Sequence, residues 1–147
     1  MISIKADFNM ADIEKQINNA TQAWFNNLLE TFRTKGREFT KRAREQTKSD
    51  GGFGNITWNL RGSIGYILLN DGVVIESYFP PLPDGELGRV TGDAYAREIA
   101  AGNGFDNGIV LILVAGMDYA TYVQNRGIDV LDTESLVFEA ELKRIMR

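Results

Sequence analysis

The segment Ile109–Ala115 is the feature that most constrains the fold. Its seven consecutive residues are all apolar, and four of them are β-branched. A run of this kind is typical of a strand that is covered on both faces or lies centrally in a sheet, and it is too short to cross a bilayer. The chain therefore needs further strands to pair with this segment and helices to cover it.

A β-hairpin is predicted upstream of that strand. Residues 63–69 and 73–79 are both rich in apolar and aromatic side chains, and Asn70-Asp71-Gly72 separates them. This tripeptide is a strong signal for a tight turn, because Asn, Asp and Gly tolerate the positive φ angles that hairpin turns need. Prolines then end the second strand. We expect a small, mainly antiparallel sheet in which residues 109–116 form the central strand.

A long amphipathic helix is predicted near the N-terminus. Asn9 is a suitable N-cap, and apolar residues follow at spacings of three and four: Ile13, Ile17, Ala20, Trp24, Leu28 and Phe32. The pattern continues to about Lys48, with Gly36 marking a kink or a break. The glycine-rich residues 49–55 fit a helix end and linker. They do not fit a phosphate-binding loop, which needs a strand before it and a helix after it.

The region 80–108 is expected to be a long, mobile excursion between strands. It holds all three prolines and six of the fifteen glycines. A short helix from about Asp93 to Ala101 is predicted within it. Further on, we expect a short helix at 119–125, a last strand near 127–131 and a closing helix from Asp132.

The predicted fold is therefore α+β. A long N-terminal helix and a C-terminal helix pack on one face of the small sheet, within a single domain of residues 1–147. The N-terminus lacks a signal-peptide pattern, so we expect the protein to stay in the compartment where it is made, with no membrane association.

The composition narrows the possible chemistry. The chain has no cysteine and no histidine, which excludes disulfides, thiol nucleophiles, imidazole bases and the usual zinc sites. No catalytic, cofactor or metal site is expected. An enzyme that uses carboxylates remains an alternative, although the acidic residues of 80–108 show no calcium-loop spacing and lie on a segment unsuited to holding two carboxylates rigidly. These residues are Asp84, Glu86, Asp93, Glu98 and Asp106.

Charge is unevenly distributed along the chain. The net charge is −4, yet residues 33–48 carry about +5, so the remainder carries about −9. The basic residues of this stripe are Arg33, Lys35, Arg37, Lys41, Arg42, Arg44 and Lys48. A solvated helix face explains such a stripe. It could also contact DNA phosphates or an acidic partner, without reading sequence.

Two short motifs, together with the order of elements, carry a resemblance to a known family. The first is Thr57-Trp58-Asn59-Leu60-Arg61-Gly62-Ser63-Ile64, before the hairpin. The second is Tyr119-Ala120-Thr121-Tyr122-Val123-Gln124-Asn125-Arg126-Gly127, after the apolar strand. The chain resembles the minor tail or tail-completion proteins of the head–tail junction of tailed phages. Their motifs read Thr-Gly-x-Leu-x-x-Ser and Tyr-Ala-x-Tyr-Val-Glu-x-Gly. Trp58 and Asn59 depart from the first motif, and Gln124 and an extra residue depart from the second.

The resemblance implies a non-enzymatic virion protein of a phage or prophage, made in the bacterial cytoplasm. It implies a ring of identical copies, for example a hexamer, beside tail-tube or head-closure proteins where DNA passes. It also places subunit contacts at Leu60, Arg61, Ser63, Tyr119, Tyr122 and Val123, although the two tyrosines could equally cover the end of the sheet. The alternative function is a small nucleic-acid or acidic-partner binding module that uses the stripe 33–48.

Overall fold

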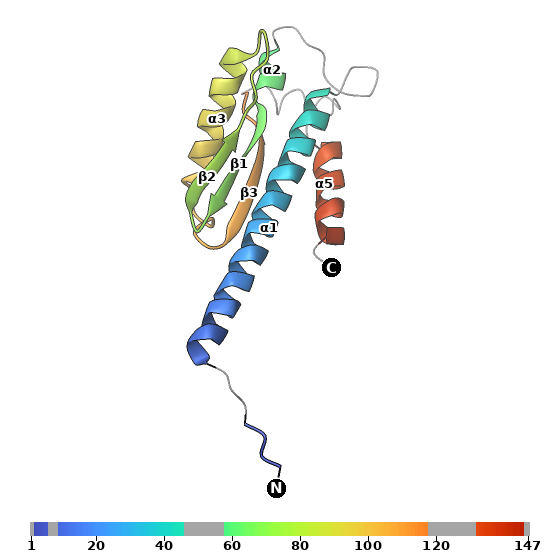
Figure 1. Ribbon diagram of the computed structural model, residues 1–147. Helices are drawn as coiled ribbons and strands as arrows, with labels where there is room; N and C mark the ends of the chain where they lie inside the picture. Colours follow the sequence, from blue (N-terminus) through green and yellow to red (C-terminus); the bar gives the residue numbers. More distant parts are fainter. Residues whose placement is uncertain (1, 6–8, 46–57, 118–131, 146–147) are drawn as a thin grey trace. The chain divides into compact units, whose positions relative to one another are not determined.

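The computed structural model describes residues 2–5, 9–45, 58–117 and 132–145. The elements are α1 (Met10–Glu45), α2 (Asn59–Gly62), β1 (Ile64–Asn70), β2 (Val73–Tyr78), α3 (Glu86–Ala100), β3 (Ile109–Ala115) and α5 (Asp132–Ile145) (Figure 1). The chain divides into two compact units, Met1–Phe32 and Arg33–Arg147. The second unit contains the last part of α1 and every other described element. The predicted α+β fold is confirmed.

The three strands form an antiparallel sheet in the order β2-β1-β3. Asn70 pairs with Val73 across the hairpin, and the two residues between them have positive φ angles of 48° at Asp71 and 79° at Gly72. Two consecutive residues in this conformation make the type I′ turn that matches the twist of paired strands. The prediction of the hairpin and of its turn is therefore confirmed.

The central strand is β1, and the prediction that residues 109–116 take this place was wrong. Six of the seven β1 residues are buried, whereas most of β3 is half-buried and β3 pairs only with β1 among the described residues. The apolar run of β3 has a different cause. Leu111 and Leu113 pack against the core on one side of the sheet, and Val110 and Ile112 pack against the core on the other.

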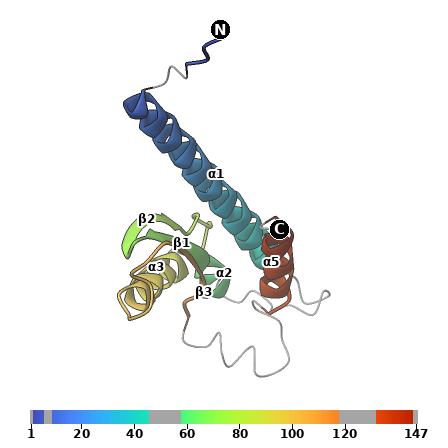
Figure 2. The ribbon, with the colours of Figure 1, turned by 90° about the horizontal axis from the view of Figure 1, so that it is seen from below.

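Helices cover both faces of the sheet. The N-terminal and C-terminal helices share one face as predicted, but the expectation that no helix covers the other face was wrong. Residues from the last part of α1, α2, β1 and α5 form one core: Phe39, Ala43, Leu60, Ile64 and Phe138. The opposite core joins the sheet to α3 through Ile67, Leu69, Phe79, Ala96, Ala100 and Val114. Figure 2 shows α3 on the side of the sheet away from α5. Successive side chains of β1 point to opposite faces of the sheet, so this strand contributes Ile64 to the first core and Ile67 and Leu69 to the second.

The helix α3 corrects the interpretation of residues 80–108 as a mobile excursion. It begins at Glu86 rather than near Asp93, and it buries Ala96 completely against the sheet. Gly88 and Gly92 lie one turn apart on its packed face. A Cβ at Gly88 would be 1.9 Å from the carbonyl oxygen of Asn59, and one at Gly92 would be 2.5 Å from that of Ser63. The glycines thus allow backbone-to-backbone contact with α2 and the start of β1.

The prediction of the start of α1 is confirmed, because the Ala11 N–H donates to Asn9 Oδ1 at 3.0 Å. The helix runs without interruption through Gly36, so the break expected there is absent. Lys48, the linker 49–55, the helix at 119–125 and the strand at 127–131 lie outside the described residues.

Candidate functional site: a cationic groove beside the hairpin

The basic stripe of α1 is largely paired with acidic residues of the same chain. Arg33 Nε donates to Glu76 Oε2 at 2.6 Å, and Arg37 Nη2 donates to Glu76 Oε1 at 3.1 Å. The Tyr66 hydroxyl donates to the same carboxylate at 2.6 Å. Burial alone would raise the pKa of Glu76, but the hydrogen bonds from Tyr66, Arg37 and Arg33 outweigh it and hold the pKa below the ordinary value. Burial and this carboxylate together raise the pKa of Tyr66.

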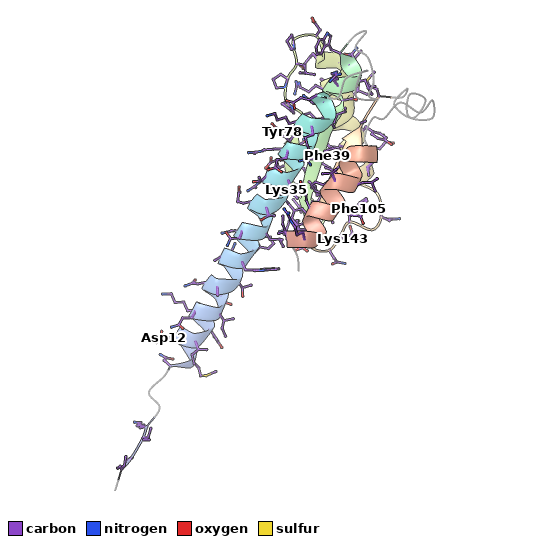
Figure 3. The ribbon with its side chains drawn as sticks, turned by 90° about the vertical axis from the view of Figure 1, so that its right-hand side faces the viewer. Asp12, Lys35, Phe39, Tyr78, Phe105 and Lys143 are labelled. Atoms are coloured by element: carbon purple, nitrogen blue, oxygen red, sulfur yellow. The ribbon has the colours of Figure 1, made fainter. Side chains whose placement is uncertain are left out.

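A second charged cluster joins α1 to α5. Lys35 Nζ lies 2.9 Å from Glu38 Oε2 and 3.4 Å from Glu141 Oε2, while Arg42 Nη1 lies 3.7 Å from Glu141 Oε1. The hydrogen bond to Glu38 leads the interactions that raise the pKa of Lys35. The rings of Phe39 and Phe138 meet edge to face beside this cluster, at 6.1 Å between centroids. Lys35 and Phe39, one turn apart on α1, are labelled in Figure 3. The solvated-face interpretation fails at Lys35 and Arg42, because Glu141 of α5 pairs with both.

Arg44 is a buried structural cation. Its side chain donates to three main-chain carbonyl oxygens: Nε to Ile64 at 3.0 Å, Nη1 to Pro80 at 2.6 Å and Nη2 to Gly62 at 2.9 Å. These bonds tie α1 to both ends of the α2–hairpin segment. Burial lowers the pKa of Arg44 to about 10, so the guanidinium remains charged at neutral pH.

Lys41 is the one member of the stripe from 33 to 45 that points into solvent without a hydrogen bond or ion pair among the described residues. It lines a groove of about 840 Å³ with three other cations, Arg37, Arg44 and Arg61. Two acids of α1, Glu38 and Glu45, also line it. The described cations in the groove therefore outnumber the acids by two.

Aromatic and proline residues also line this groove: Trp58, Tyr78, Pro80 and Pro81. Tyr78 stacks on Tyr66 at 5.2 Å between centroids, and the Arg37 guanidinium carbon lies 5.3 Å from the Tyr78 ring centroid. Trp58 is 42% exposed and has a φ of 60°. A left-handed backbone is unfavourable for a bulky residue and is found mostly where surrounding structure enforces it. The groove therefore combines basic, aromatic and proline side chains with a residue in an unfavourable backbone conformation.

Leu60 and Ser63 of the first motif serve the interior of the protomer. Leu60 belongs to the core, and Ser63 is fully buried with its hydroxyl donating to the Leu60 carbonyl at 2.8 Å. Burial gives these two side chains a role in the core of the protomer, and their expected role in subunit contact stays a prediction. Arg61 is 7% exposed and lines the groove, and burial lowers its pKa. Asn59, which departs from the family pattern, accepts a hydrogen bond from the Gly88 N–H at 3.2 Å.

The acids of 80–108 do not converge on a reaction centre in the described residues. Asp93 accepts hydrogen bonds from the Ser77 hydroxyl and, at 3.0 Å, from Arg97 Nε, so it links α3 to β2. Glu86 pairs with Arg89 one turn later in α3. Within the described ranges, no group of three or more acidic side chains is placed to hold a metal ion.

The sequence did not reveal the groove, because Trp58 and the prolines come together only once α1 docks on the hairpin. Tyr119, Tyr122 and Val123 lie outside the described residues.

None of the helices in the described part of the chain is long and apolar enough to span a membrane. Searches against protein-family models, curated proteins and solved structures find no match for this chain.

Proposed function

We propose that this protein is a structural subunit that assembles with copies of itself. Its place, on the resemblance given above, is the head–tail junction of a tailed phage or prophage, where it completes or joins the tail as a non-enzymatic ring. A hexamer is one such ring, and tail-tube or head-closure proteins are its neighbours in the virion. The observation that best supports self-assembly is the surface of the first part of α1.

Residues 10–32 of α1 carry a row of exposed apolar side chains. Met10, Ile17 and Trp24 follow one another at intervals of seven residues and are 62%, 58% and 64% exposed. Ile13 and Ala20 lie three residues after the first two. This is the a/d spacing of a coiled coil, over about two heptads. We name Met10, Ile13, Ile17, Ala20 and Trp24 the α1 seam.

A second copy of the same helix fits the α1 seam best. Only four residues of 10–32 are charged: Asp12, Glu14, Lys15 and Glu30. Their net charge of −2 gives no basic face for DNA phosphates or anionic lipid. It also gives little repulsion between two copies side by side. Rings with cyclic symmetry bring equivalent residues to the same level, so a parallel, in-register pairing of the seam is compatible with a ring.

Helix propensity supports the need for a partner. Residues 18–27 include four asparagines, which are weak helix formers, and isolated helices of this length are marginal in water. Burial of the seam against another copy would supply the missing stabilisation.

Light scattering coupled to size-exclusion chromatography tests the proposal, with the protein alone and with purified tail tubes. We expect a mass above that of a monomer, rising with concentration or on addition of tubes. Ile17→Glu places a charge in the seam and should abolish the larger species. Gln22→Glu, on the opposite side of α1, is the matched control and should behave like the wild type. A wild-type protein that remains monomeric alone and with tail tubes or portal complexes would rule the proposal out.

The second candidate is a nucleic-acid binding module. The charge of the stripe 33–48 motivates it, but the ion pairs of Arg33, Lys35, Arg37 and Arg42 with Glu38, Glu76 and Glu141 leave much of that charge compensated. A salt titration of duplex binding decides between the two. Phosphate contacts predict a steep loss of affinity with salt.

A further inference from the structure

The groove beside the hairpin contains a buried positive charge that pairs with no carboxylate in the described part of the chain. Arg44 is 9% exposed, and its three acceptors are neutral carbonyl oxygens of Ile64, Gly62 and Pro80. Hydrogen bonds satisfy its N–H groups, but the charge itself has no acidic partner within the described residues. An anionic group entering the groove would therefore be stabilised by a cation that the fold already holds in place.

Accessible cations lie along the same helix. The Arg37 side chain is 54% exposed although it reaches Glu76, and Lys41, one turn further on, is exposed and free of described partners. With Arg44 these residues follow one another at spacings of four and three, so they share one face of α1. Charges in a concave site focus the potential there more strongly than on a convex surface.

Apolar walls accompany these cations. Trp58 lines the groove and is partly exposed, and Pro80 and Pro81, which also line it, follow β2. Prolines lack N–H donors and tryptophan presents a flat apolar surface, so this wall suits the aliphatic part of a side chain and an extended backbone rather than a free ion.

We infer that this groove binds an extended, acidic segment of a protein partner, with its carboxylates facing Arg37 and Lys41. Separate carboxylates fit better than a continuous phosphate backbone, because Glu38 and Glu45 line the same groove and would repel closely spaced charges. Base stacking on Tyr78 is also disfavoured, because its ring already contacts Tyr66 and Arg37. The inference is independent of the α1 seam, which lies on other residues.

Tryptophan fluorescence can measure this binding on the full-length protein. The chain has two tryptophans, so Trp24→Phe leaves Trp58 as the sole reporter and keeps the seam apolar. The probe is a peptide of about ten residues with alternating Glu and Ala, roughly 33 Å long when extended. The same peptide with Gln for Glu and a single-stranded oligonucleotide of equal charge are the comparison probes.

We expect saturable binding of the Glu peptide that changes Trp58 emission and weakens with salt. Lys41→Glu in this background should lower the affinity about tenfold, because it reverses a charge at the rim of the groove. Lys15→Glu makes the same charge change on an exposed position of the same helix outside the groove, and it should change the affinity less than about twofold. Urea unfolding of both variants verifies that they fold.

Three results would each overturn the inference. The Gln peptide could bind as tightly as the Glu peptide, Lys41→Glu and Lys15→Glu could weaken binding equally, or the oligonucleotide could compete more strongly than the Glu peptide. The last result would assign the groove to nucleic acid. None of these results depends on whether the protein forms rings, so failure of the proposed assembly leaves the outcome unchanged.

Discussion

Gly36 of α1 lies directly against the ring of Tyr66 in β1. A Cβ at position 36 would come within 2.8 Å of two ring carbons. Tyr66 cannot move aside easily, because it is fully buried, stacks on Tyr78 and is hydrogen-bonded to Glu76. This close approach is what allows Arg33 and Arg37 of α1 to reach Glu76 across the sheet.

Gly36→Ala is therefore predicted to destabilise the protein. Alanine favours a helix over glycine by about 1 kcal/mol, but overpacking against Tyr66 costs about 1–3 kcal/mol. Urea unfolding should show a net loss of stability. Thr34→Ala, two residues away and exposed, is the control and should be neutral or slightly stabilising. A gain in stability for Gly36→Ala would show that the Tyr66 ring can move aside to accommodate the added methyl group.

Gly88→Ala should be more damaging than Gly36→Ala. Its Cβ would approach a main-chain carbonyl oxygen to 1.9 Å, and backbone cannot rotate out of the way as a side chain can. The whole of α3 would have to shift from α2, at a cost above about 3 kcal/mol. Denaturant midpoints measure this loss. Equal midpoints for Gly88→Ala and the wild type would contradict the contact between α3 and α2.

Arg44→Met should lose about 2–5 kcal/mol, although methionine has a similar length. Replacing a buried ion pair by apolar residues is often neutral, but here the acceptors are three carbonyl groups that would lose their donors. Arg97→Met removes an exposed arginine paired with Asp93 and should cost less than about 1 kcal/mol. Similar losses for the two variants would argue against the structural role of Arg44.

Glu76 should contribute stability that depends on pH. Its pKa is lower in the folded protein than the ordinary value of 4.5. The contribution is therefore complete above about pH 5 and is lost as the pH falls through the folded-state pKa. Glu76→Gln should cost about 1–3 kcal/mol at pH 7 and clearly less at about pH 3. Unfolding at both pH values measures the difference. A cost that is independent of pH would mean that the charge of Glu76 does not matter.

The hairpin and the start of α1 could be predicted from sequence because local chemistry decides both. Asp71 and Gly72 accept positive φ angles, and the Asn9 side chain caps the first turn. The length of α3 could not be predicted in this way. Gly88 and Gly92 lower its helix propensity, and only close packing on α2 and β1 explains their presence.

The order of the strands and the ion pairs of the basic stripe also could not be predicted from local sequence patterns. The segments of β1 and β3 are both apolar, and only their pairing shows which lies in the middle. Arg33 and Glu76 are far apart in sequence, so their ion pair could not be anticipated from the helix alone. The groove has the same origin, since Lys41, Trp58 and Pro80 come from three separate segments.

Cysteine cross-linking tests the proposed assembly most directly, because the chain has no cysteine of its own. In a parallel, in-register pairing, position 17 of one copy faces position 17 of the next, within the roughly 7 Å between Cα atoms that a disulfide requires. Ile17→Cys should form covalent dimers rapidly under mild oxidation at low protein concentration, whereas Gln22→Cys, facing away from the seam, should not. Equal and slow cross-linking of the two variants, with or without tail tubes, would contradict the assignment of α1 as the assembly surface.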